Sequence, residues 1–269
     1  MYTPPHAITD VSSYANVIVG IQGPPGSGKT TSALSFPNPV IALFERPDFR
    51  GVLQDLPHLK DVKPIVLPFY DADFILNKLK QPKSGDQFDS ANAFVKWVQT
   101  ESIKLTQEQT LVIDNWTRLQ EQFDKVNWSA PLYPTYSRKG EIDDFAPWAR
   151  KIDFAEAVSN ALLQCKCNVV VIFHEVQERE QGTGRLLDKI QPLMQGKFVA
   201  KLKSYYPNFF RQRCIITPIK DKEGKIIDEK REYVWQTKGS LDFDAKCSWP
   251  NLPALIPATY QSLTFSPKQ

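Results

Sequence analysis

Short apolar runs alternate along the chain with stretches in which apolar residues recur every three or four positions. The apolar runs predict buried strands at 16–21, 40–44, 64–67, 110–114 and 168–173. The helical spacing predicts helices on either side of a polar turn at 80–90, and further helices at 115–126 and 145–162. Strands that alternate with helices predict an α/β fold, in which a mostly parallel, twisted sheet is flanked by helices.

The pattern changes after His174. Residues 177–206 are polar and basic, and they predict a long loop region. Two strands at 211–219 and 231–237, around a turn at 221–225, predict a C-terminal antiparallel β-hairpin added to the sheet. No linker separates a second domain. We therefore predict one domain over 1–269, with a core at about 16–246, an N-terminal strap at 1–15 and a Pro-rich C-terminal tail at 247–269.

Composition and charge narrow the class of protein. Hydrophobic residues make up 42% of the 269 positions, which predicts a globular protein rather than a disordered one. No apolar run approaches the roughly 18 residues of a membrane helix, and residues 1–14 lack the apolar stretch of a signal peptide. The four cysteines form no CxxC pair and no disulfide framework, so free thiols in a reducing compartment are expected. The prediction is a cytoplasmic protein with no membrane partner.

The first strand leads into a glycine-rich loop, GPPGSGKT, which fits the pattern GxxxxGK[ST]. In such loops backbone N–H groups point at a phosphate, Lys29 supplies a cation and Thr30 offers a hydroxyl to Mg²⁺. Because the motif lies between a predicted strand and a predicted helix, a chance glycine turn is the weaker interpretation. We predict that ATP and Mg²⁺ bind here, with the nucleotide held by Gly23, Pro24, Pro25, Gly26, Ser27, Gly28, Lys29, Thr30 and Thr31.

Two carboxylates follow predicted strands. Asp114 ends the strand at 110–114, where phosphate-loop proteins place the carboxylate that holds Mg²⁺; the alternative is a helix cap. Glu45 follows the strand at 40–44, where a carboxylate can face the γ-phosphate and activate water; the alternative is a solvated turn residue. AAA+ proteins often share the GPPGxGKT loop but carry an acidic residue directly after the strand-end Asp. Asn115 stands at that place, which departs from a plain AAA+ pattern.

Taken in order, the phosphate loop, Glu45, the strand ending at Asp114 and the strand at 169–173 followed by His174 resemble the core ATPase domain of the RecA superfamily. More narrowly, the chain is similar to core-only phage nucleotide-binding proteins that act as recombinases or single-strand annealing proteins. The resemblance covers residues 16–246. It implies a RecA-like P-loop NTPase fold and a phage-encoded ATPase in the host cytoplasm, with Lys29, Glu45 as the water-activating base, and His174 as catalytic residues. His174 stands where recombinases commonly have a Gln that senses the γ-phosphate; a structural hydrogen-bonding role is the alternative.

The resemblance also implies two DNA-binding loops. The first, at 127–141, contains aromatic and basic residues: Trp128, Tyr133, Tyr136, Arg138 and Lys139. The second begins near Gln177, and its segment 185–220 holds eight cations against one acid, a local charge of +7. Aromatic faces with cations suit single-stranded nucleic acid, although a solvated surface is the alternative. The candidate cations of this second loop are Arg179, Arg185, Lys189, Lys197, Lys201, Lys203, Arg211 and Arg213.

By the same resemblance, ATP lies between subunits of a homo-oligomer, either a ring or a filament. Lys238 and Lys246 are candidates to reach a neighbour's γ-phosphate, and ordinary surface lysines are the alternative. The expected function is an ATP- and Mg²⁺-dependent, single-stranded-DNA-binding ATPase in homologous recombination or single-strand annealing, with a single-strand-binding protein as a candidate partner. Three alternatives stay open: a helicase-related or helicase-loading ATPase, a small-molecule kinase, and a nucleotide-gated binding module that does not hydrolyse ATP.

Overall fold

The computed structural model describes residues 16–46, 59, 61–70, 90–129, 132–179, 183, 186–194 and 198–263. The predicted N-terminal strap and the helix expected before residue 80 lie outside these residues. The strands are β1 (Ile18–Gly23), β2 (Pro39–Leu43), β3 (Ile65–Pro68), β4 (Thr110–Asp114), β5 (Asn168–Arg179), β6 (Leu186–Pro192), β7 (Asn208–Lys220), β8 (Ile226–Gln236) and β9 (Leu255–Pro257). The helices are α1 (Lys29–Leu34), α4 (Ser90–Thr100), α5 (Trp116–Asn127), α6 (Ala146–Leu163) and α7 (Phe198–Tyr205), with short 3₁₀ turns at Ser102–Lys104 and Tyr260–Leu263.

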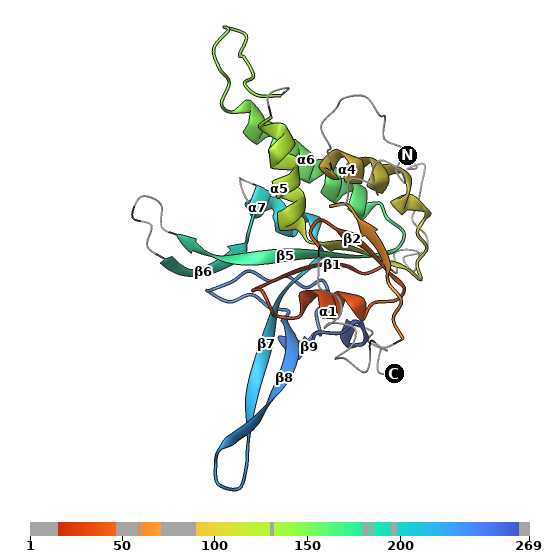
Figure 1. Ribbon diagram of the computed structural model, residues 1–269, viewed down its shortest axis with the longest axis vertical. Coiled ribbons are helices and arrows are strands. Elements are labelled where there is room, and N and C mark those ends of the chain that lie inside the picture. Colours follow the sequence, from red (N-terminus) through yellow and green to blue (C-terminus); the bar gives the residue numbers. More distant parts are fainter. Residues whose placement is uncertain are drawn as a thin grey trace, which may run out of the picture.

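Within the described residues the strands form one sheet in the order β3-β2-β4-β5-β1-β7-β8-β9, shown in Figure 1. Every neighbouring pair from β3 to β7 is parallel. The pairs β7–β8 and β8–β9 are antiparallel, and β6 pairs antiparallel with the outer part of β5. The predicted α/β fold is therefore confirmed, as is the antiparallel hairpin that follows the parallel strands. The phosphate-loop strand β1 and the strand β4 that ends in Asp114 are separated by β5, so three strand ends meet at one edge.

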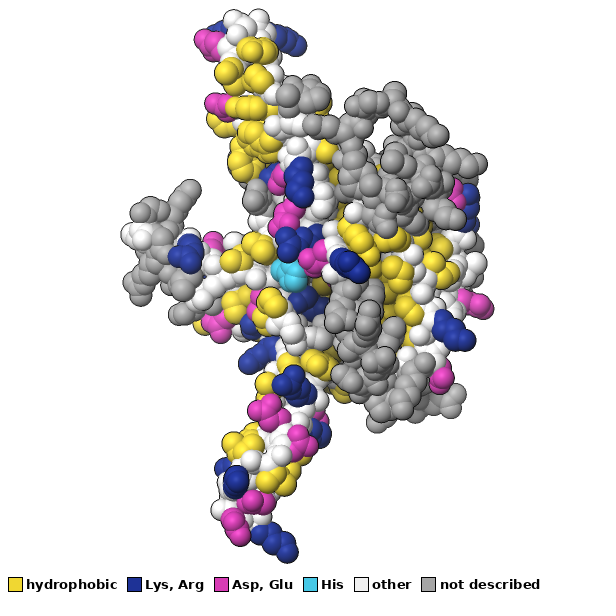
Figure 2. Space-filling model, in the orientation of Figure 1, with side chains coloured by type: hydrophobic (Ala, Val, Ile, Leu, Met, Phe, Trp, Pro, Cys, Tyr) yellow, Lys and Arg dark blue, Asp and Glu magenta, His cyan; other side chains and the backbone are white. Residues whose placement is uncertain are grey.

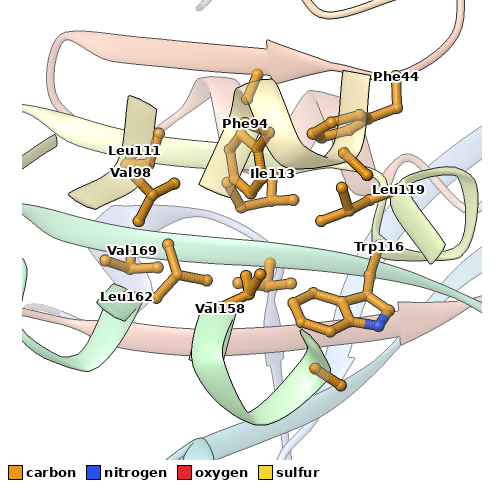
Figure 3. Close-up of a cluster of buried hydrophobic side chains, with 14 of the residues drawn as sticks. Phe44, Phe94, Val98, Leu111, Ile113, Trp116, Leu119, Val158, Leu162 and Val169 are labelled. Carbon is orange, nitrogen blue, oxygen red and sulfur yellow. The ribbon is translucent and has the colours of Figure 1, made fainter. Parts of the chain in front are cut away.

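Both faces of the sheet are covered, which explains why its strands are continuously apolar. Side chains alternate between the faces: Leu111 and Ile113 of β4 join the cluster under α4, α5 and α6, whereas Val112 joins the cluster under α1. Figure 3 shows part of the first cluster, with Trp116 at the start of α5 packed beside Val158 of α6. Each such buried side chain contributes about 1.5–3 kcal/mol. This packing fixes the strand ends on which the candidate site stands.

The region expected to be a long loop after Gln177 is instead ordered into a hairpin and a helix. Strand β5 continues to Arg179 beyond the body of the sheet and pairs with β6, and α7 follows. The inner half of β5 is buried and its outer half is largely exposed. The outer half is therefore polar in sequence, which is why the sequence did not predict a strand there. The predicted extended tail similarly contains β9, which pairs with β8, and the 3₁₀ turn after it.

Three segments project from the body in Figure 1: residues 128–129 and 132–145 beyond α5, the β5–β6 hairpin, and the β7–β8 hairpin. The outer halves of β7 and β8 are exposed along their length. All four cysteines lie in the described part of the chain and are free thiols, as predicted. None of the described helices has the length and apolar character needed to span a membrane.

Candidate nucleotide-binding site

The glycine-rich loop joins the end of β1 at Gly23 to the start of α1 at Lys29. Gly26 and Gly28 have φ angles of 75° and 81°, in the left-handed region that glycine adopts without steric cost. A Cβ at Gly28 would lie 2.5 Å from the ring of Tyr233, which covers the loop from β8. The strand, loop and helix that the motif requires are thus present, and the loop can hold this conformation only with glycine at that point.

Lys29 is buried within the loop that it follows. Its Nζ donates hydrogen bonds to the backbone oxygens of Gly23 at 2.8 Å and Pro24 at 2.7 Å. Burial lowers the pKa of Lys29 to about 8, while the negative charges of Asp114 and Glu175 act in the opposite direction. A poorly solvated ammonium group interacts more strongly with phosphate oxygens than one in bulk water. Lys29 is therefore placed for the role that the sequence assigns to it.

Thr30 and Asp114 form the candidate magnesium site. The Thr30 hydroxyl donates to Oδ2 of Asp114 at 2.7 Å, which brings two oxygen ligands together beside the loop. Burial raises the pKa of Asp114, the hydrogen bond from Thr30 lowers it, and Glu45 adds a further raising effect. A cation between these oxygens would offset the cost of the buried carboxylate. The donor set fits Mg²⁺, which prefers one or two protein oxygens together with phosphate and water oxygens.

No group of three or more His, Cys, Asp or Glu side chains suited to a metal occurs among the described residues. A metal ion held by Thr30 and Asp114 would therefore take its other ligands from the nucleotide and from water. This requirement links the predicted magnesium site to the presence of a phosphate group in the loop.

Glu45 lies two residues after the end of β2, and two donors hold its carboxylate. Oε1 accepts from Nδ2 of Asn115 at 2.9 Å, and Oε2 accepts from Nε of Arg118 at 2.8 Å. Asn115 is buried, and its Oδ1 caps α5 by accepting from the backbone N–H of Arg118 at 2.9 Å. The Arg118–Glu45 pair has side-chain exposures of 46% and 42%, so it orients the carboxylate more than it stabilises the fold.

His174 completes this network from β5. It lies opposite Gly23 in the register of β1 and β5, and its Nε2 is 3.1 Å from Nδ2 of Asn115. Burial lowers the pKa of His174, and the nearby charge of Lys29 lowers it further, while Glu45 acts in the opposite direction; the balance favours the neutral imidazole. Because the Asn115 amide nitrogen can only donate, Nε2 is the acceptor, and this assigns the ring proton to Nδ1.

A cavity of about 370 Å³ joins these groups, within the roughly 300–1,000 Å³ range of small-molecule sites. Its lining brings together Lys29, Thr30, Glu45, Asp114 and His174, which the sequence singled out from four separate segments. Three further residues at or beside the pocket were not predicted from the sequence: Asn115 as a hydrogen-bond donor to Glu45, Arg118 and Tyr233. Asn115 and Arg118 could have been found, because they come shortly after the strand-end Asp. Nothing in the sequence indicates Tyr233, because only the β7–β8 pairing brings it to the loop.

The candidates of the first DNA loop lie on the segment beyond α5. Trp128 packs against Tyr133 at 5.1 Å between ring centroids, and the Tyr133 hydroxyl donates to Asp144 at 3.0 Å. Arg138 and Lys139 lie in a tight turn closed by a hydrogen bond from the N–H of Gly140 to the oxygen of Ser137. These residues form an ordered projection, with Tyr136 exposed near its tip.

The cations of the second loop are not a free basic patch. Lys189 pairs with Glu178, Lys201 with Glu156 and Arg211 with Glu175, and all three acids lie outside segment 185–220. The Arg211–Glu175 side chains are only 14% and 9% exposed, and both nitrogens involved are 3.0 Å from carboxylate oxygens. Arg211 is thus held in a buried ion pair. Because acids from outside the segment neutralise three of its cations, a ligand at this surface would experience less positive charge than the +7 counted from the sequence.

The remaining candidates are scattered. Arg179 and Arg213 are exposed on the projecting hairpins, whereas Arg185, Lys197 and the side chain of Lys203 lie outside the described residues. Lys238 and Lys246 are exposed on the loop between β8 and β9, where the backbone of Lys246 pairs with Phe209. Neither lysine lines the nucleotide pocket of its own chain.

Several solved structures are similar to the model, each at low sequence identity. The flagellar accessory protein FlaH from Methanocaldococcus jannaschii is 12% identical over 85% of this chain and 79% of its own, with a TM-score of 0.38. The RadB recombinase is 12% identical over 82% of this chain and 88% of its own, with a TM-score of 0.36. The type III secretion ATPase EscN from enteropathogenic E. coli is 12% identical over 73% of this chain and 42% of its own, with a TM-score of 0.38.

No curated protein sequence matches the chain. Because all three TM-scores are below 0.5, the family assignment rests on a domain match alone: a model described as an AAA domain matches residues 15–206. That range contains the phosphate loop, Glu45, Asp114 and His174, so a P-loop protein of nucleotide-dependent activity is confirmed, even with Asn115 after the strand-end Asp. A phage origin stays a prediction. The chain belongs to the AAA domain family.

Proposed function

We propose that this chain is a Mg²⁺-dependent ATPase that also binds single-stranded DNA. The observation that carries the proposal is the cavity at the edge of the sheet that contains the phosphate loop. It joins a phosphate loop with Lys29, the Thr30–Asp114 oxygen pair and the Glu45 carboxylate. These are the three kinds of group that phosphoryl transfer to water requires: charge stabilisation, metal ligands and a base.

In this mechanism the loop N–H groups and Lys29 bind the β- and γ-phosphates. Thr30 and Asp114 would hold Mg²⁺, which supplies charge neutralisation on the phosphate oxygens. Glu45 accepts the proton of the water that attacks the γ-phosphorus, the bond to the bridging oxygen breaks, and ADP and phosphate leave. Asn115 and Arg118 hold Glu45 in place for this transfer, to which a positioned base contributes about 10²–10⁴-fold.

The support for DNA binding comes from the segment beyond α5. Exposed apolar side chains run along it in Figure 2, and the exposed aromatic ones are Trp128, Tyr136 and Phe145, with Trp148 beside Trp128 in the first turn of α6. Arg138 and Lys139 lie at its tip, but three acids in 128–145 outnumber these two cations. Stacking of bases on aromatic rings is therefore the main contribution, and we expect a shallow dependence of binding on salt concentration.

Helix α5 connects the two sites. It begins directly after the Asp114–Asn115 corner of the pocket and ends at Asn127, about 18 Å away at 1.5 Å per residue. We further propose a role in homologous recombination or single-strand annealing, as a ring or filament of identical subunits and with a single-strand-binding protein as partner. Lys238 and Lys246 remain candidates for contact with a neighbour's nucleotide in such an assembly.

The experiment is a phosphate-release assay with Mg²⁺ and ATP, with and without single-stranded oligonucleotide. We expect turnover that needs Mg²⁺ and rises with DNA. ATP binding without turnover would replace the proposal with a nucleotide-gated module, and transfer of phosphate to a small acceptor would replace it with a kinase. Stimulation by a replicative helicase in place of DNA would indicate a helicase loader.

A further inference from the structure

A glutamine on the hairpin strand β7 is bonded directly to the phosphate loop. Gln212 is fully buried, and its Nε2 donates to the backbone oxygen of Ser27 at 2.8 Å. Its Oε1 accepts from the Ser32 hydroxyl at 2.6 Å and from the indole nitrogen of Trp235 at 2.9 Å. One side chain thus connects the loop, helix α1 and both strands of the hairpin.

The orientation of this amide is fixed by its neighbours. The indole nitrogen of Trp235 can only donate, so it requires the amide oxygen of Gln212 to face it. The amide nitrogen must then face the Ser27 oxygen, which can only accept. Trp235 lies directly opposite Gln212 in the hairpin register and is itself fully buried, so its indole cannot turn away. The strands of the hairpin therefore determine which atom the phosphate loop meets.

The bond to Ser27 has a consequence for the phosphate-binding N–H groups. The Ser27 carbonyl and the Gly28 N–H belong to one planar trans peptide, in which they point in opposite directions. When Gln212 holds the carbonyl toward the interior, the Gly28 N–H is directed away from Gln212. Gly28 lines the nucleotide pocket. The backbone of Gln212 also adjoins the loop, since a Cβ at Gly23 would lie 2.7 Å from the Gln212 oxygen.

We propose that Gln212 is a positioning residue for the phosphate loop, which it holds ready for nucleotide through the Ser27 carbonyl. Trp235 acts with it by fixing the amide orientation. The proposal rests on the proposed nucleotide binding and deepens it, because it places a determinant of affinity on the hairpin, outside the pocket lining. The hairpin is then part of the nucleotide site: Gln212 and Trp235, at the base of the hairpin, pack behind the phosphate loop and hold it in place.

The test uses Gln212→Met, which keeps the length and burial of the side chain but removes all three hydrogen bonds, and Trp235→Phe, which frees the amide to turn. Thr237→Val is the matched control, because Thr237 directly follows β8 and this change removes the hydrogen bond from its buried side chain to the Pro253 oxygen. Three quantities are measured for each: the Kd for ATPγS, backbone hydrogen exchange of residues 24–32 without nucleotide, and Tm.

We expect Gln212→Met to raise the Kd about 10-fold, which corresponds to about 1.4 kcal/mol, and to speed exchange in the loop. Trp235→Phe should do both to a smaller extent, and Thr237→Val should lower Tm with neither effect. Wild-type Kd and wild-type loop exchange in both test variants would overturn the proposal. If the wild-type chain binds no nucleotide, the proposed function fails, while loop exchange still reports on Gln212.

Discussion

The nucleotide pocket and the segment beyond α5 use side chains in opposite ways. Lys29 and Asn115 in the pocket, and Gln212 behind the phosphate loop, are buried and hydrogen-bonded, so the chemistry and the packing depend on the same atoms. On the segment, Phe145 is 82% exposed and Tyr136 64%, and the fold gains little from either ring. Large exposed aromatics that packing does not require point to a ligand. Pocket variants should thus change stability and function together, and segment variants function alone.

The largest effect is expected from Lys29→Met. Nucleotide affinity should fall about 100-fold or more, because the cation that faces the phosphates is lost. The same variant should stabilise the nucleotide-free protein at pH 7 by about 1–2 kcal/mol, since it removes a buried charge at the cost of two hydrogen bonds. Calorimetry gives the affinity, and denaturant unfolding gives the stability.

The pH dependence of that stability follows from the lowered pKa of Lys29. The cost of burying the ammonium is fully present below about pH 8 and is relieved as the pH rises toward the ordinary value of 10.5. The difference in unfolding free energy between Lys29→Met and wild type should therefore shrink over that range. A variant that is less stable than wild type at pH 7 would contradict the account of a buried charge.

Glu45→Gln separates catalysis from binding. The amide can still accept a hydrogen bond but cannot take a proton, so turnover should fall about 100-fold or more while the Kd for ATP stays within about 3-fold. Glu101→Gln, an exposed glutamate paired with Lys104 far from the pocket, is the control and should leave both unchanged. If Glu45→Gln turned over ATP at the wild-type rate, the base would be another group.

The double variant Tyr136→Ala and Phe145→Ala tests the segment. It should weaken binding of single-stranded DNA about 30-fold or more, since each of the two rings contributes about 1–3 kcal/mol per stacked base, with Tm and nucleotide affinity unchanged. Ile226→Ala with Ile227→Ala, similarly exposed at the tip of the β7–β8 hairpin, serves as control. DNA affinity that responds to the hairpin pair and not to the aromatic pair would place the DNA site on the hairpin.

Arg118→Gln is expected to have the smallest effect. Its ion pair with Glu45 is exposed, so stability should change by less than about 1 kcal/mol. Loss of one of the two groups that orient Glu45 should lower kcat about 3-fold and leave KM unchanged, as for an interaction that matters after binding. A change in KM with constant kcat would instead show that Arg118 contacts the nucleotide.

The sequence predicted those parts of the molecule that are encoded locally. The apolar runs located β2, β4 and the inner half of β5, and the glycine motif located the phosphate loop, because burial on both faces and tight backbone turns leave direct marks in composition. The contacts of Tyr233 and Gln212 with the loop cannot be read from the local sequence, since the β-strand pairing of the hairpin brings them there. The +7 segment misled because folding brings Glu156, Glu175 and Glu178 to three of its cations.

Calorimetric titration of the protein with ATPγS, in the presence and absence of Mg²⁺, tests the central claim most directly. The account predicts one site per chain, an affinity about 10-fold higher with Mg²⁺, and no detectable binding to Lys29→Met. Absence of binding by the wild-type chain, or equal affinity for wild type and Lys29→Met, would contradict the assignment of the pocket.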